Sequence, residues 1–247
     1  MSEAKSGTRI GLFGGTFNPI HLGHLRAAEE VREAQDLERV LFIPSAVPPH
    51  KHAHVNDPIA PTEERLAWVE RAVADHKDFS VDRIEVDRKG PSFLVDTLEA
   101  IREREAGRRS TVFIVGEDAF AEMGDWRAPE KIFALSDFAV MTRPPGQLTD
   151  LRTRIPSVVG DAFEFESEGR RAHHKSAGTT IDLVPISALE ISSSSIRERC
   201  REGRSIRFLV PETIRSEIEA SGRYSAKGPN PTKRKNARAE DEDEENP

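Results

Sequence analysis

The fold follows from one run of residues, Arg9-Ile-Gly-Leu-Phe-Gly-Gly-Thr-Phe-Asn-Pro-Ile-His-Leu-Gly-His24. Its first part, Arg9–Phe13, is apolar and short, which predicts a buried strand. Gly14 and Gly15 follow, and glycine lets a backbone turn sharply and come close to a ligand. From about Ile20 the pattern becomes helical. A strand, a Gly-rich turn and a helix start predict a phosphate site, because the first N–H groups of a helix are unpaired and attract anions.

Two histidines lie at the start of this predicted helix. His21 and His24 are three residues apart, so both rings lie on one face of the first turn, and Gly23 keeps that face open. Imidazole can donate hydrogen bonds to phosphoryl oxygens and stabilise charge during phosphoryl transfer. Two alternatives stay open: a tight turn with histidines that cap a surface helix, and a zinc site, for which no third ligand at suitable spacing lies nearby.

Size and composition place limits on the class of protein. A chain of 247 residues suits one α/β domain plus a tail. Cys200 is the only cysteine, which excludes an internal disulfide framework and suits a reducing cytosol. No apolar run is long enough to span a membrane, and the N-terminus lacks the apolar core of a signal peptide. We therefore expect a cytoplasmic protein that does not bind membranes.

The net charge of −7 comes largely from one end of the chain, where Glu240–Glu245 supplies six negative charges. Without that run the chain is close to neutral, so no global field favours nucleic acid or a membrane as a partner. The segment 223–247 is rich in charge and poor in apolar residues, which predicts a disordered tail. We expect a flexible N-terminus over residues 1–8 and one folded domain over residues 9–222.

Strand-like and helix-like segments alternate along this domain, which predicts a Rossmann-like, doubly wound parallel sheet with helices on both faces. The expected strands are Arg9–Phe13, Val40–Pro44, Phe79–Val81, Thr111–Val115, Phe138–Thr142 and Ile181–Val184. The expected helices are Leu22–Gln35, Glu63–Asp75, Ser92–Arg104 and Pro129–Leu135, with Thr62 as an N-cap. Ligands of such sheets bind at the carboxyl ends of the strands. The polar segment Pro144–Thr180 is expected to be a solvated surface excursion, or else a contact with a partner or a neighbouring subunit.

Four further segments accompany the Gly-His run: Val47-Pro-Pro-His-Lys51, Gly90–Leu98, Gly116-Glu-Asp118 with Asp125-Trp126, and Ile191–Arg197. Together, in this order, they resemble the nucleotidylyltransferase superfamily and, within it, the bacterial nicotinate-mononucleotide adenylyltransferases. The resemblance covers about Arg9 to Ser221. It implies a fold of the nucleotidylyltransferase type and transfer of AMP from ATP to nicotinic acid mononucleotide, which gives nicotinic acid adenine dinucleotide and pyrophosphate in NAD biosynthesis. It also implies Mg²⁺ with ATP and leaves room for a homo-oligomer.

The resemblance assigns roles to individual residues. It makes His21 and His24 the catalytic pair, with His24 nearest the reacting centre. The residues expected to bind ATP and its phosphates are Gly14, Gly15, Thr16, Phe17, Lys51, Asp118, Ser193 and Arg197. Among them, Asp118 would bind a ribose hydroxyl and Lys51 would balance phosphate charge. Ser193 is expected to cap a helix, and Arg197, one turn later, to bind the leaving pyrophosphate. The plainer alternatives are an ordinary capped helix, a solvent-exposed Lys51 and an N-cap at Asp118.

The residues expected to bind the mononucleotide are Ser92, Thr97, Trp126 and Arg127, with Trp126 stacked on the pyridine ring or, alternatively, packed in the core. The family commonly has Tyr-Thr where this chain has Phe93-Leu94, and Leu94 cannot donate a hydrogen bond to the nicotinate carboxylate. Ser92, backbone amides near Trp126 or the charge of Arg127 would have to compensate.

Other functions stay open. They are an adenylyltransferase specific for nicotinamide mononucleotide or for both forms, a phosphopantetheine adenylyltransferase, and a noncatalytic nucleotide sensor. A Rossmann oxidoreductase is disfavoured because the first turn lacks Gly-x-Gly-x-x-Gly. A class I tRNA synthetase is disfavoured because the chain is short and lacks a recognisable anticodon-binding domain.

Overall fold

A computed structural model describes residues 8–48, 59–105, 109–142, 149–187, 189–226 and 228. These residues form one sheet with the strand order β3-β2-β1-β4-β5-β8-β7-β6. The strands are β1 (Thr8–Gly15), β2 (Arg39–Pro44), β3 (Phe79–Val81), β4 (Arg109–Gly116), β5 (Asp137–Thr142), β6 (Phe163–Phe165), β7 (Arg171–His174) and β8 (Thr180–Pro185). The first five strands and β8 pair in parallel, whereas β6 and β7 pair antiparallel at one edge.

The direction in which the chain adds strands to the sheet changes between β1 and β4. From β1 the chain adds β2 and then β3 on one side, and it returns to add β4, β5 and β8 on the other side. Crossover connections on the two sides leave a crevice at the carboxyl ends of β1 and β4, where ligands of open α/β sheets bind. The end of β1 is the Gly14-Gly15 turn, so the topology places the Gly-His run at this crevice.

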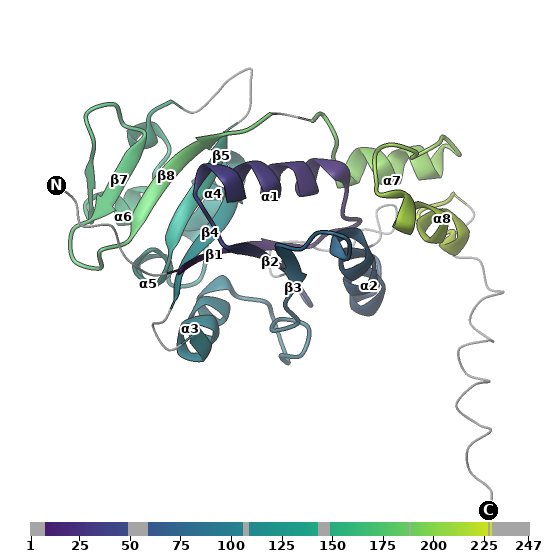
Figure 1. Ribbon diagram of the computed structural model, residues 1–247, viewed down its shortest axis with the longest axis horizontal. Coiled ribbons are helices and arrows are strands. Elements are labelled where there is room, and N and C mark those ends of the chain that lie inside the picture. The colour runs from purple at the N-terminus through teal and green to yellow at the C-terminus, as the bar shows by residue number, and fades with distance from the viewer. Residues whose placement is uncertain are drawn as a thin grey trace, which may run out of the picture.

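Helices cover both faces of the sheet, as the alternating pattern predicted (Figure 1). One core contains apolar side chains from α1 (Leu22–Ala34), α2 (Thr62–Val73), α7 (Ser193–Arg201) and α8 (Glu212–Ser221). The other contains side chains from α3 (Leu94–Glu105), α4 (Glu117–Glu122), the 3-10 turn η1 (Met123–Asp125), α5 (Pro129–Leu135) and α6 (Ser157–Gly160), and from the 3-10 turn η2 (Leu151–Thr153). Neighbouring residues of one strand face opposite cores: Leu12 lies in the second and Phe13 in the first. The doubly wound fold is therefore confirmed.

The six expected strands are all present, each within two residues of its predicted ends. The expectation that Pro144–Thr180 is a solvated surface excursion was wrong over the part that the structure describes. Leu151, Val159, Phe163 and Ala172 are buried, and β6 and β7 extend the sheet. These strands are short and alternate buried with exposed residues, so the segment has too few apolar residues in sequence to stand out. Among the described helices, none has the length and apolarity needed to cross a bilayer.

Two predicted boundaries need correction. Helix α2 includes Thr62 as its first residue, after an N-cap at Pro61, and the Thr62 hydroxyl donates to the carbonyl of Ala46 instead of capping the helix. The folded domain also extends beyond residue 222, into the expected tail. Tyr224 is buried, and Arg223 forms an ion pair with Glu64. Residues 227 and 229–247 of that tail, and the expected flexible residues 1–7, lie outside the described part.

Arg65 of α2 ties together the loops that border the crevice. It is only 1 % exposed, and its guanidinium donates to three backbone carbonyls: Thr16 at 2.7 Å, Ala60 at 2.9 Å and Ala46 at 3.2 Å. A buried carbonyl without a partner carries the full desolvation penalty of that group. Arg65 therefore fixes the turn after β1 and the loop after β2 to the same helix.

The substitution Arg65→Met should lower the free energy of unfolding by about 2–5 kcal/mol, because it leaves several buried carbonyls without donors. Arg71→Met is the matched control on the same helix. Arg71 is half exposed and pairs with Glu217 at the surface, so its loss should cost less than about 1 kcal/mol. Urea unfolding followed by circular dichroism measures both values. Equal effects of the two substitutions would contradict the role given to Arg65.

Candidate active site

The glycines of the turn after β1 pack closely against aromatic side chains. A side chain at Gly14 would lie 3.3 Å from the ring of Phe113, and one at Gly15 would lie 2.9 Å from the ring of Phe17. The left-handed conformation at this turn belongs to Phe17, with φ of 46°, and its ring is buried. The glycines are therefore required for room against two aromatic rings, and Gly14, Gly15 and Thr16 form part of a cavity wall.

His21 and His24 lie as a stacked pair, with ring centroids 3.6 Å apart and an angle of 27° between the rings. His21 is the N-cap of α1, and its backbone N–H donates to Nδ1 of His24 at 3.2 Å. Neutral His24 must then carry its proton on Nε2, because Nδ1 is the acceptor. Gly23 leaves the space that the His21 ring occupies, since a Cβ there would lie 3.0 Å from His21 Nδ1. The sequence-based placement of both rings at one helix start is confirmed.

The loop between the end of β1 and the start of α1 is held in place by α7. Ser193 Oγ donates to the carbonyl of Pro19 at 2.8 Å, and the guanidinium of Arg197 donates to the carbonyl of Asn18 at 2.8 Å. The N-cap of α7 is Ser192, whose hydroxyl accepts from the backbone of Ser195, so the prediction that Ser193 is the cap was wrong. Arg197 is buried, and this contact gives it a role in shaping the histidine loop.

Asn18 joins that loop to distant parts of the chain. Its side-chain oxygen accepts from the backbone N–H of Ala60 at 2.9 Å and from the hydroxyl of Tyr224 at 2.6 Å. Burial raises the pKa of the Tyr224 phenol far above its ordinary value, so the phenol stays protonated and acts as the donor. The loop that carries the histidines is thus fixed by α7, by the segment before α2 and by the residues after α8.

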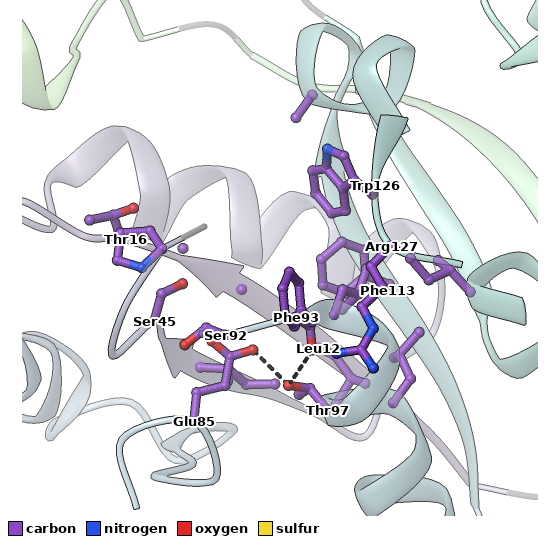
Figure 2. Close-up of a pocket in the computed structure, with 18 of the residues that line it drawn as sticks. Leu12, Thr16, Ser45, Glu85, Ser92, Phe93, Thr97, Phe113, Trp126 and Arg127 are labelled. Carbon is purple, nitrogen blue, oxygen red and sulfur yellow. Dashed lines mark hydrogen bonds between the residues drawn. The ribbon is translucent and has the colours of Figure 1, made fainter. Parts of the chain in front are cut away.

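A cavity of about 260 Å³ opens beside this turn. Figure 2 shows Thr16 at one end and Trp126 with Arg127 at the other. The guanidinium of Arg127 lies 4.8 Å above the ring of Phe93, and it lies 3.6 Å from the carboxylate of Asp96. Trp126 is half-buried and packs at the edge of the second core, as the core alternative predicts, while its stacking on a pyridine ring stays a prediction.

The cavity brings together all four residues predicted for the mononucleotide. Its wall includes Ser92, Thr97, Trp126 and Arg127, together with Phe93 and Leu94. The hydroxyl of Thr97 is engaged within the protein: it donates to Glu85 Oε1 at 2.8 Å and accepts from Arg88 at 3.0 Å. Thr97 therefore orients neighbouring groups in the wall.

Glu85 was missed by the sequence analysis. It lies in the loop between β3 and α3, is 6 % exposed, and lines the cavity. Burial raises the pKa of its carboxyl above the ordinary value, and hydrogen bonds from Thr97 and Ser92 act in the opposite direction. Its surrounding segment Asp82–Arg88 contains several charged residues, so no local pattern distinguishes this carboxylate from its exposed neighbours.

Several predicted catalytic and ATP-binding residues do not line this cavity: Phe17, His21, His24, Asp118, Ser193 and Arg197. Asp118 is exposed in the first turn of α4, whereas Ala119 and Glu122 of the same helix line the cavity. Lys51 lies outside the described residues. Within the described ranges, no three histidine, cysteine, aspartate or glutamate side chains group in a way that could hold a metal ion. The donors around the turn are amides and imidazoles, which suit phosphate oxygens.

Comparison with known proteins gives the family. Residues 12–199 match the model of the cytidylyltransferase-like family. The chain is 45% identical over 219 residues to a probable nicotinate-nucleotide adenylyltransferase of Trichlorobacter lovleyi, which covers 87% of this chain and 99% of that protein. It is 41% identical to the protein of the same description from Geobacter sulfurreducens, over 89% of this chain and 100% of that one.

Solved structures agree on the fold. The nicotinic acid mononucleotide adenylyltransferase of Plasmodium falciparum, complexed with APC, superposes with a TM-score of 0.61 at 15% identity, over 86% of this chain and 95% of that one. A putative nicotinate-nucleotide adenylyltransferase of Vibrio parahaemolyticus gives a TM-score of 0.55 at 19% identity, over 88% and 95% of the two chains. Because the sequence matches extend over nearly the whole of the curated relatives, this chain belongs to the cytidylyltransferase-like family and, within it, to the nicotinate-nucleotide adenylyltransferases.

Proposed function

We propose that this protein transfers AMP from ATP to nicotinic acid mononucleotide, forming nicotinic acid adenine dinucleotide and pyrophosphate. The observation that carries the proposal is a cavity that runs from the Gly14–Thr16 turn to Trp126, with the stacked pair His21 and His24 at the start of the helix that follows this turn. This arrangement provides donors for a triphosphate next to an aromatic slot for a planar ring. The relatives that match this chain over nearly their whole length are described as probable nicotinate-nucleotide adenylyltransferases.

The reaction needs positioning and charge stabilisation. An oxygen of the mononucleotide phosphate attacks the α-phosphorus of ATP, a new P–O bond forms, and the bond from the α-phosphorus to the bridging oxygen breaks as pyrophosphate leaves. A phosphate monoester is already an anion near neutral pH, so no general base is required. The protein must hold two anions in line and stabilise the charge on the equatorial oxygens.

His24 is suited to that task by its tautomer. Since Nδ1 accepts the N–H of His21, neutral His24 carries its proton on Nε2, which can donate to a phosphoryl oxygen. The amides of residues 15–17 and the first turn of α1 add further donors. Mg²⁺ would be held by the phosphate oxygens and water, and would shield the charge of the triphosphate.

The cavity also favours a second substrate. Phe93 and Leu94 give an apolar wall where a hydroxyl would select the nicotinate carboxylate, and an apolar wall accepts a neutral amide. Turnover of nicotinamide mononucleotide is therefore the alternative function. The guanidinium of Arg127 lies over the ring of Phe93, and it is the group that would favour the acid. The cytoplasmic location and the homo-oligomer stay predictions.

The first test incubates the protein with Mg-ATP and either nicotinic acid or nicotinamide mononucleotide, with release of pyrophosphate and formation of dinucleotide as readouts. We expect faster turnover of the acid. Turnover of the amide at an equal or higher rate would assign the alternative function. Absence of turnover with both substrates would contradict the proposal.

The substitution His24→Asn should lower kcat by about 10²–10³-fold with little change in KM, because it removes a donor to the transition state. Asparagine keeps an acceptor near the position of Nδ1, so the start of α1 should persist, and circular dichroism checks this. His76→Asn is the control, because His76 lies at the surface beside Glu29 and should have no effect on kcat. Equal kcat values for wild type and His24→Asn would exclude His24 from catalysis.

The substitution Arg127→Met should lower kcat/KM for the acid about five- to tenfold and leave that for the amide unchanged, since it removes the charge but keeps an apolar stem over Phe93. Arg102→Met, at an exposed position of α3, is the matched control. An unchanged ratio of acid to amide turnover would exclude Arg127 as the selecting group.

A further inference from the structure

A polar wall lies between the two ends of the cavity. It consists of Glu85 and Ser92, from the loop between β3 and α3, and Ser45, from the loop after β2. Figure 2 shows these side chains between Thr16 and the aromatic end. The rest of the lining is largely apolar, so this wall is the main polar feature of the described cavity between the turn and Arg127.

The hydrogen bonds of the wall leave Glu85 as an acceptor. Its carboxylate receives the hydroxyl of Thr97 at 2.8 Å, and Ser92 and Ser45 line the cavity with it. Ser92 is held in this wall by accepting the N–H of Ala46 at 3.0 Å. An ionised carboxylate offers about four acceptor positions, so the bond from Thr97 leaves room for a hydroxyl of a ligand.

A carboxylate in this position selects its ligand by chemistry. It attracts a hydroxyl or amine donor, and it repels a phosphate or carboxylate group. A mononucleotide presents a phosphate, a sugar and a ring in that order, and only the sugar provides hydroxyl donors between the two ends. The cavity presents the Gly14–Thr16 turn, the Glu85 wall and the aromatic slot in the same order.

We infer that Glu85 binds a ribose hydroxyl of the mononucleotide and that Glu85, Ser45 and Ser92 form its sugar subsite. This inference rests on the proposed function, since it names the part of that substrate which the wall recognises. Repulsion from Glu85 also directs the nicotinate carboxylate toward Arg127, at the other end of the cavity.

The test compares the ribosyl substrate with its 2′-deoxy and 3′-deoxy forms. For the wild type, removal of the bound hydroxyl should lower kcat/KM about 10- to 100-fold, as expected for a hydrogen bond to a charged acceptor. In Glu85→Ala this penalty should fall to less than about twofold, because no acceptor is left for the hydroxyl to lose. Glu85→Gln keeps a neutral acceptor and should give an intermediate penalty, and it serves where the alanine variant is poorly folded.

Two control variants distinguish binding of the hydroxyl by Glu85 from a purely structural role of Glu85. Glu122→Gln removes another carboxylate that lines the cavity and should keep the full penalty. Thr97→Val removes the hydrogen bond from Thr97 to Glu85 but keeps the Glu85 carboxylate. It should therefore lower the stability of the protein and retain the deoxy penalty. A role of Glu85 that is only structural would change kcat/KM for all substrates equally and leave the deoxy penalty at its wild-type size, which would overturn the inference.

Calorimetric titration with the same mononucleotides gives a second readout that needs no turnover. Normal turnover with no deoxy penalty in the wild type would overturn the sugar subsite and leave the proposed function intact. Binding of the ribosyl form in preference to the deoxy forms, without turnover, would support the subsite and contradict the proposed reaction. A mononucleotide that neither binds nor reacts would contradict both.

Discussion

The arrangement of the site depends on a buried guanidinium. Arg65 reaches from α2 to carbonyls of the turn after β1 and of the loops on either side of residues 49–58. The carbonyls of Thr16, Ala46 and Ala60 lie outside the strands and helices, and a buried carbonyl needs a donor. Arginine supplies donors in several directions from one rigid group, so a single side chain orients segments that do not pair with each other.

The residues expected from the sequence to contact phosphate do not all have the same surroundings in the structure. Thr16 lines the cavity, whereas Ser193 and Arg197 donate to the carbonyls of Pro19 and Asn18. A motif that serves to shape a loop is as restricted in residue type as one that binds substrate. Residue type and spacing therefore locate the site well, but they do not distinguish its ligands from its supports.

The fold was largely predictable because its signals are local. The β1 strand, the glycine turn and the histidine helix follow one another within sixteen residues, and the central strands are apolar runs bordered by polar segments. The edge strands β6 and β7 were missed because each is only three or four residues long and half exposed. The cap of α7 was misplaced by one residue within a run of four serines, where neighbouring hydroxyls have equal local propensity.

The parts of the site that escaped prediction rely on long-range contacts. Glu85 acquires its role from burial against α3, and Tyr224 acquires its role from Asn18, 206 residues earlier in the chain. This last contact has a consequence for how the protein is made. Synthesis proceeds from the N-terminus, so the histidine loop emerges from the ribosome first and receives its final support last. A chain that stops before Tyr224 would contain every residue of the Gly-His run and still lack one of the hydrogen bonds that set its shape. Completion of the domain is thereby coupled to the final shape of the histidine loop.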